Sequence, residues 1–148
     1  MHHLILAPVL AFAACASDAP PPVTGAETKS TAELLNTYWK LTQLGGQVIT
    51  TPEGAREIHL VLHSENQRVA GFSGCNNMMG NYVLEGDKLR FGQMGSTMMA
   101  CVGSGMELEK EFHSVFPQVA HWSIRGETLQ LRDADGKTLA NFESRYLK

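Results

Sequence analysis

The chain has 148 residues, of which 43% are hydrophobic and 18% are charged, so its length and composition predict one ordinary globular domain rather than a disordered protein. The formal net charge is −3, and the lysines and arginines are scattered without a basic run. This excludes the charge pattern typical of nucleic-acid-binding proteins, and we expect no nucleic acid among the partners.

The N-terminal residues have the pattern of an export signal. An apolar run from Leu4 to Ala14 is far shorter than the roughly 20 residues that a membrane-spanning helix needs, so residues 1–14 are predicted to be a signal peptide. Residues 12–15, Phe-Ala-Ala-Cys, resemble a bacterial lipobox, in which Cys15 is acylated and the signal is cut just before it. The alternative is a plain secretory signal with an incidental cysteine.

Residues 15–31 are predicted to be a flexible tether that begins at the lipidated cysteine. Their Pro, Ala, Ser and Thr content cannot bury a core. Ala16 follows the cysteine where an Asp would resemble an inner-membrane retention signal, which favours the outer membrane of a Gram-negative cell. We therefore expect a lipoprotein that faces the periplasm, with a folded, monomeric domain over residues 32–148.

From about Ala32 onward, short segments with alternating apolar residues predict an antiparallel sheet. About eight short strands are expected: one over residues 37–44 that ends at a Gly-Gly turn, a hairpin over 56–72, a second hairpin over 81–91, and three more strands over 121–144. The fold class is therefore predicted to be mainly β (α+β), with the sheet curled toward a barrel.

Residues 104–116 have helical spacing instead, with apolar residues at Leu108, Phe112, Val115 and Phe116. Ser104 and Glu107 match a capping box at the start of this predicted helix. Pro117 disfavours helical geometry at Phe116, so we expect the helix to end there. One inserted helix is therefore expected to plug or cover the open side of the sheet.

Three motifs lie between the predicted strands: Gly74-Cys75-Asn76, Gly80-Asn81-Tyr82 and Thr97-Met98-Met99-Ala100-Cys101. With the opening strand, they resemble the META domain of the heat-shock HslJ-like lipoproteins over about Asn36 to Phe142. The resemblance implies an antiparallel cracked β-barrel with an inserted helix, similar to the pilot lipoproteins of type III secretion. It also implies a role in envelope or heat stress and antibiotic tolerance, with no catalytic chemistry.

Cys75 and Cys101 are candidates for a disulfide, because an acylated Cys15 leaves them as an even pair in an oxidising compartment. Closing a loop of this length contributes about 3 to 4 kcal/mol by the chain-entropy estimate. The alternative is two buried thiols that act as small apolar groups.

The cysteines and methionines also allow a metal hypothesis. Thioether and thiolate ligands favour Cu(I), and the candidate ligands are Met78, Met79, Met98, Met99, Cys75 and Cys101. Methionine more often fills irregular gaps in a core, so we expect no cofactor.

Other candidate sites have ordinary structural explanations. His59 and His63 share one face of a predicted strand, about 13 Å apart at roughly 3.3 Å per residue, so we expect them at the surface rather than on one zinc ion. Ser73 lacks the G-x-S-x-G spacing of a nucleophile, and Asp133 and Asp135 fit a hairpin turn. We do not expect an enzyme.

Gly74 and Asn76 suit a tight connection, since Gly permits positive φ and Asn tolerates it. We expect Asn76 to hold the segment from Thr97 to Cys101 by side-chain hydrogen bonds, with Tyr82 packed beneath. The expected function is that of a non-catalytic envelope lipoprotein, a stress-related binding or protective module that holds a lipid tail or an apolar peptide between sheet and helix. The alternatives are a periplasmic Cu(I)-binding protein and an adaptor for an envelope complex.

Overall fold

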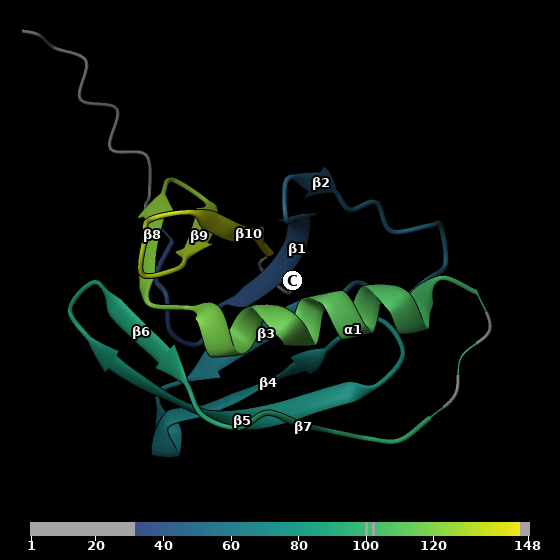
Figure 1. Cartoon of the computed structure of the whole chain (residues 1–148), viewed down its shortest axis with the longest axis horizontal. Coiled ribbons are helices and arrows are strands. Elements are labelled where there is room, and N and C mark those ends of the chain that lie inside the picture. Colours follow the sequence, from purple (N-terminus) through teal and green to yellow (C-terminus); the bar gives the residue numbers. More distant parts are fainter. Residues whose placement is uncertain (1–31, 100, 102, 146–148) are drawn as a thin grey trace, which may run out of the picture.

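One antiparallel sheet curls on itself in the computed structural model, which describes residues 32–99, 101 and 103–145 (Figure 1). Its strands are β1 (Tyr38–Leu44), β2 (Gln47–Val48), β3 (His59–His63), β4 (Arg68–Phe72), β5 (Asn77–Glu85), β6 (Lys88–Phe91), β7 (Gly95–Ser96), β8 (His121–Arg125), β9 (Thr128–Arg132) and β10 (Thr138–Arg145). The prediction of a mainly β fold is confirmed. The predicted signal peptide (1–14), Cys15 and the tether (15–31) lie outside the described residues.

Eight of the strands form a ring in the order β10-β9-β8-β6-β5-β4-β3-β1, which β1 closes by pairing with β10. The short strands β2 and β7 lie off this ring, on β1 and β5. The ring is weakest between β6 and β8, which share the single register pair Lys88 and His121. The indole of Trp122 supports this joint by donating a hydrogen bond to the carbonyl of Gly86, at 2.8 Å. The barrel is therefore cracked, as the family resemblance implied.

The alternating pattern of the sequence places one face of each strand inside the ring. Trp39, Leu60 and Leu129 are fully buried, while their neighbours along the strands face outward. A shift of one residue in register would bring the outward set into the core, so burial fixes the pairing. The two predicted hairpins are present as β3–β4 and β5–β6, and the three strands predicted over 121–144 are present as β8, β9 and β10.

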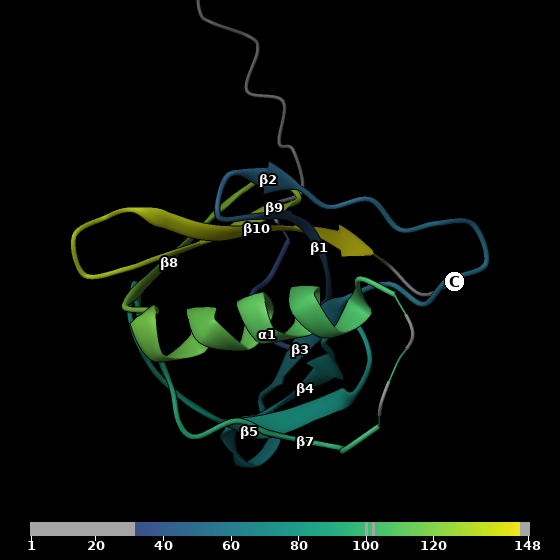
Figure 2. The same cartoon turned by 45° about the vertical axis from the view of Figure 1, so that its right-hand side comes forward.

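The predicted helix is present as α1 (Gly105–Val115), which lies across the ring between β3–β5 and the β1–β10 side in both views (Figures 1 and 2). The predicted capping box is wrong, because Ser104 already has helical φ and ψ and its side chain makes no capping hydrogen bond. The predicted end of the helix near Phe116 is confirmed, because α1 ends at Val115, but the non-helical geometry expected of Phe116 before Pro117 is wrong. Phe116 keeps helical geometry and begins a 3-10 turn, η2 (Phe116–Gln118), in which Pro117 needs no amide donor.

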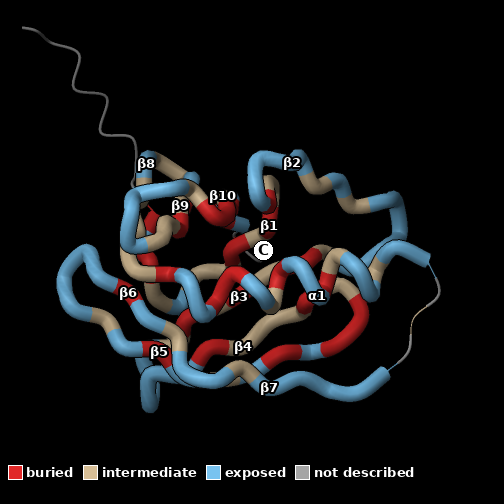
Figure 3. The backbone as a smooth tube through the Cα atoms, viewed as in Figure 1, coloured by how far each residue is buried: buried red, intermediate tan, exposed pale blue. Residues whose placement is uncertain are grey.

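The space between α1 and the sheet is filled with side chains. Buried positions lie along the inner side of the helix and the facing strands (Figure 3), and the largest fully buried side chains include Trp39, Phe112, Phe116, Phe142, Leu41, Leu44, Leu60, Leu62 and Leu131. The expected ligand space between sheet and helix is therefore occupied by the core. Among the residues described, no helix combines the length and apolar character that crossing a bilayer requires.

Candidate functional site

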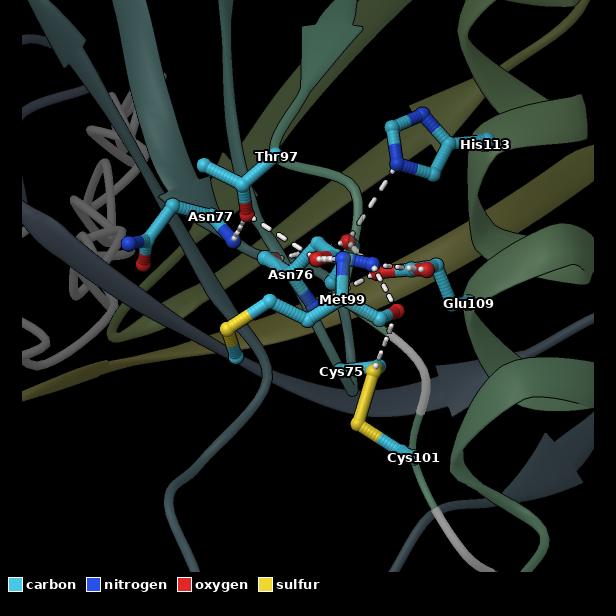
Figure 4. The surroundings of a disulfide bond; sticks show 9 residues. Cys75, Asn76, Asn77, Thr97, Met99, Cys101, Glu109 and His113 are labelled. Atoms are coloured by element: carbon cyan, nitrogen blue, oxygen red, sulfur yellow. Dashed lines mark hydrogen bonds between the residues drawn. A yellow bond between two sulfur atoms is a disulfide. The ribbon is translucent and has the colours of Figure 1, made fainter.

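A disulfide between Cys75 and Cys101 joins the bend after β4 to the segment after β7 (Figure 4). The Cα atoms are 5.8 Å apart, within the usual range for a disulfide, and the bond closes a sequence separation of 26 residues. The two cysteines are therefore bonded rather than two separate thiols. Cys75 is buried, while Cys101 is half-buried.

Asn76 connects the same two segments by hydrogen bonds. Its Oδ1 accepts from Thr97 Oγ1 at 3.0 Å and from the backbone N–H of Met99 at 2.6 Å, and its Nδ2 donates to the Met99 carbonyl at 3.2 Å. Gly74 has a φ of +123°, and a Cβ there would lie 3.0 Å from the carbonyl oxygen of Gly105. The bend therefore lies directly against the first residue of α1, which only glycine permits. We call the bend, the disulfide and the 97–101 segment the seam.

Glu109 of α1 completes the seam from the helix side. Its carboxylate accepts hydrogen bonds from Ser73 Oγ at 2.5 Å, from the backbone N–H of Asn76 at 2.8 Å and from Asn76 Nδ2 at 2.9 Å. Burial by itself would raise the pKa of Glu109, but these bonds and one from the Cys75 backbone outweigh it and hold the pKa below its ordinary value. Glu109 is therefore a buried anion that fixes α1 to the bend.

Ser73, His113 and Glu109 lie in contact, but their order differs from that of a nucleophile activated by a base. The carboxylate accepts from Ser73 directly, and His113 Nε2 lies 3.2 Å from the same Ser73 oxygen. In a catalytic triad the carboxylate orients the histidine instead. Ser73 is also fully buried, so a substrate has no access to its hydroxyl. The three side chains form a structural contact between bend and helix.

The remaining motif residues lie in different places. Gly80 leaves room for Met94, whose Sδ would lie 2.5 Å from a Cβ at this position. Tyr82 is buried, but its hydroxyl donates to the carbonyl of His63 at 2.7 Å. The expectation that Tyr82 packs beneath Asn76 is wrong, because Tyr82 lies six positions further along the extended β5, about 20 Å away at roughly 3.3 Å per residue. Ala100 lies outside the described residues.

The candidate Cu(I) ligands do not converge. Met78 is 1% exposed and points into the core, whereas Met79, on the opposite face of β5, is 52% exposed. Met98 and Met99 are exposed at 95% and 61%, and the two cysteine sulfurs are bonded to each other. Among the described residues, no group of three or more His, Cys, Asp or Glu side chains is placed to hold a metal ion.

His59 and His63 are half-buried rather than at the open surface. The His59 ring stacks on Tyr38 at a centroid distance of 4.2 Å, and its Nδ1 lies 3.0 Å from the Glu57 carbonyl. Burial lowers the pKa of His59. The two histidines are on the outer face of β3, as the strand pattern predicted.

A cleft of about 560 Å³ opens beside the seam, between the N-terminal end of α1 and the 49–58 loop. Its walls include Gly74 and Gly105 of the seam contact together with Ile49, Ile58 and Leu108. A second hollow of about 310 Å³ continues it along α1 toward β2, and the two share Ile49, Thr50, Ser104 and Leu108. We call the combined feature the α1 groove.

Comparison with known proteins agrees with this arrangement. The family model described as META domain matches residues 32–146. The fold is similar to the NMR structure of a protein from Burkholderia xenovorans, with a TM-score of 0.62 and 30% identity over 77% of this chain and 85% of that one. A second NMR structure has a TM-score of 0.58 and 21% identity, over 74% of this chain and 91% of that chain. No curated protein matches the sequence. The chain belongs to the META domain family.

Proposed function

We propose that the chain is a non-catalytic envelope lipoprotein, anchored through Cys15, whose META domain binds extended apolar peptide segments in the α1 groove. The apolar run before Cys15 supports export and anchoring. The Cys75–Cys101 disulfide supports an oxidising compartment, because structural disulfides persist there and are rare in the cytosol. Segments of this kind are exposed when envelope proteins unfold, which is the link to stress protection.

The observation that carries the proposal is the unpaired edge of β2 along the groove. β2 pairs with β1, and among the described residues no strand pairs with its other side. Gln47, Val48, Ile49 and Thr50 form one wall of the hollow, and Ser104, Glu107, Leu108 and Glu111 of α1 form the other. An extended peptide can add to an open strand edge by backbone hydrogen bonds, with its side chains in adjoining pockets.

Apolar side chains among the polar lining of the groove can hold the apolar side chains of a peptide. Ile49, Ile58 and Leu108 line the groove, and Val48, which is 66% exposed, extends the apolar surface at the β2 end. The volume of about 560 Å³ falls within the roughly 300 to 1,000 Å³ of typical ligand sites.

Side chains of opposite charge at the two ends of the groove favour one orientation of the bound peptide. Glu107 and Glu111 are exposed on the α1 wall near β2, and Arg56 lines the far end. Arg56 is held in place, since it lies 4.4 Å over the Phe72 ring and donates to Asn77 Oδ1 at 2.8 Å. We therefore infer that the preferred peptide carries a basic residue at the β2 end.

Fluorescence anisotropy with a labelled peptide tests the proposal. The probe has valine and serine in alternation after one lysine. Val48→Asp should weaken its binding by at least about ten-fold, since it replaces an apolar contact with a charge. Val83→Asp is the matched control, because Val83 is also an exposed strand valine, at 54%, but lies on β5. Equal affinities of the two variants, or no binding by the wild type, would refute the groove assignment.

Further experiments test the class of the ligand and the anchor at Cys15 independently. Glu107→Lys should weaken the lysine-bearing peptide and leave the same peptide without lysine unaffected. Decanoate displacing the peptide with equal strength would favour an acyl chain over a peptide as the ligand. Mass spectrometry of protein purified from its own membranes should show acyl groups on Cys15, and an unmodified Cys15 would contradict the anchor.

A further inference from the structure

The β8–β9 hairpin presents a polar outer face on the side of the ring away from β5 and β7 (Figures 1 and 2). Its cross-strand pairs on this face are His121 with Arg132, Ser123 with Gln130, and Arg125 with Thr128. The intervening Leu129 and Leu131 are fully buried, which fixes the orientation of the whole face. Alternation therefore places two arginines, two hydroxyls and one amide on a single surface.

This face is hollowed rather than flat. A pocket of about 380 Å³ is lined by Ser123, Ile124, Arg125, Thr128, Gln130 and Arg132. The described residues that line it include two arginines and no aspartate or glutamate. Glu143 of β10 borders it, opposite Thr128, but lies 3.9 Å from the guanidinium of Arg145, so the lining arginines leave the face with a positive charge. A merely solvated sheet face usually mixes charges of both signs. The two arginines of the lining have no carboxylate partner within the pocket, which favours an anionic ligand.

The two arginines can reach one ligand from opposite ends. They lie two cross-strand rows apart, about 13 Å along the strands at roughly 3.3 Å per residue, with the Ser123–Gln130 row between them. Arg132 is half-buried, and its Nη1 donates to Gln130 Oε1 at 3.3 Å, which directs the guanidinium along the face. A guanidinium matches the geometry of a phosphate with two parallel hydrogen bonds, and the hydroxyls of Ser123 and Thr128 add donors.

The pocket adjoins the point where the described domain begins. The backbone N–H of Ala32 donates to the carbonyl of Gly126, in the turn next to Arg125, at 2.9 Å. With Cys15 anchored as proposed above, the anchored chain enters the described domain at Ala32, so the hairpin lies on the side of the domain nearest the anchored chain.

We propose that this pocket binds the phosphate of an anionic phospholipid headgroup and thereby orients the domain on its membrane. The assignment of the ligand as a membrane lipid rests on the proposed anchoring at Cys15. The assignment of the pocket as an anion-binding site does not depend on that anchoring. Binding at the hairpin directs the opposite side of the domain toward the periplasm. The site is separate from the α1 groove, so the two binding activities can be measured independently.

Nuclear magnetic resonance titration with soluble short-chain lipids tests this site. Dihexanoyl phosphatidylglycerol, below its micelle-forming concentration, should shift the amide signals of Ser123, Thr128 and Gln130. Dihexanoyl phosphatidylcholine should bind more weakly. Arg125→Gln should reduce the affinity for phosphatidylglycerol about five-fold, and Arg125→Gln with Arg132→Gln about 25-fold, at the usual contribution of one basic residue near an anionic surface. Arg90→Gln on β6 is the matched control and should change nothing.

Three results would overturn the proposal. Absence of shifts on the hairpin would exclude the pocket, and equal affinity for the two lipids would exclude charge recognition. Equal affinity for inorganic phosphate and phosphatidylglycerol would make this a site for free anions and not a headgroup site. Arg125 is exposed, so its substitution leaves the fold intact and the test does not depend on Arg132. A negative result in this lipid titration would not refute the proposed function, because the peptide titration and the mass of Cys15 test that function separately.

Discussion

Replacing Glu109 with alanine removes the carboxylate that joins α1 to the bend after β4. Ser73 can turn its hydroxyl to the Asn76 carbonyl, 3.0 Å away, and Asn76 Nδ2 keeps Met99 as a partner. The backbone N–H groups of Cys75 and Asn76 lose their shared acceptor. Each buried donor left unpaired costs about 1 to 3 kcal/mol, so we expect a loss of about 4 kcal/mol in the free energy of unfolding.

Urea and thermal unfolding of the oxidised protein measure this loss. In a domain of this size, about 4 kcal/mol corresponds to a drop of about 15 °C in Tm. Glu107→Ala is the matched control on the same helix, because Glu107 is exposed, and it should stay within about 0.5 kcal/mol of the wild type. A loss below about 1 kcal/mol for Glu109→Ala would refute the buried-anion interpretation of the seam.

The acid dependence of stability provides a second measure of the same carboxylate. The pKa of Glu109 is lower in the folded state than its ordinary value of 4.5, so the unfolded chain binds more protons in the acidic range. The stabilisation is therefore complete above about pH 4.5 and is lost as the pH falls through the folded pKa. Glu109→Gln should remove this component of the acid-induced loss, and an identical pH profile in wild type and variant would contradict it.

Three further predictions concern the seam and the sheet. Replacing Cys75 and Cys101 with serine should lower the free energy of unfolding by about 3.5 kcal/mol in denaturant titration, and full retention of stability would show that the disulfide does not restrain the unfolded chain. Asn76→Ala should lower Tm by several degrees, and an unchanged value would mean that the 97–99 segment is held by other contacts. Gly71→Ala should destabilise more than Gly80→Ala, because the added Cβ of Gly71 would clash with the backbone carbonyl of His59, whereas that of Gly80 meets mainly the flexible Met94 side chain. The reverse order in thermal unfolding would contradict this.

The strands and the helix could be predicted from the sequence because burial there follows a simple period. Leu60 and Leu62 on β3 alternate with outward residues, and Phe112 and Phe116 repeat at helical spacing. The short strands β2 and β7 were not predicted, since two residues are too few for any period. The capping box predicted at Ser104 was also wrong. A side chain that matches the motif makes the capping hydrogen bond only if the backbone of the capping residue has non-helical φ and ψ.

The candidate site was predicted in part. The motifs indicate Cys75, Asn76 and Cys101, which the structure brings together, but Glu109 belongs to none of them. A signal was present, because Glu109 lies three residues before Phe112 and so shares its apolar face. The α1 groove could not be predicted, because it depends on how the 49–58 loop, which has no periodic pattern, packs beside the helix.

Hydrogen exchange of the β2 amides tests the peptide-binding account most directly. The amides from Gln47 to Thr50 border the groove, and the edge of β2 that faces away from β1 should gain protection when a peptide strand pairs with it. We predict that the valine–serine peptide slows exchange in this segment and leaves the β8–β9 hairpin unchanged. Unchanged exchange at β2 under saturating peptide, or protection confined to another face of the ring, would contradict the account.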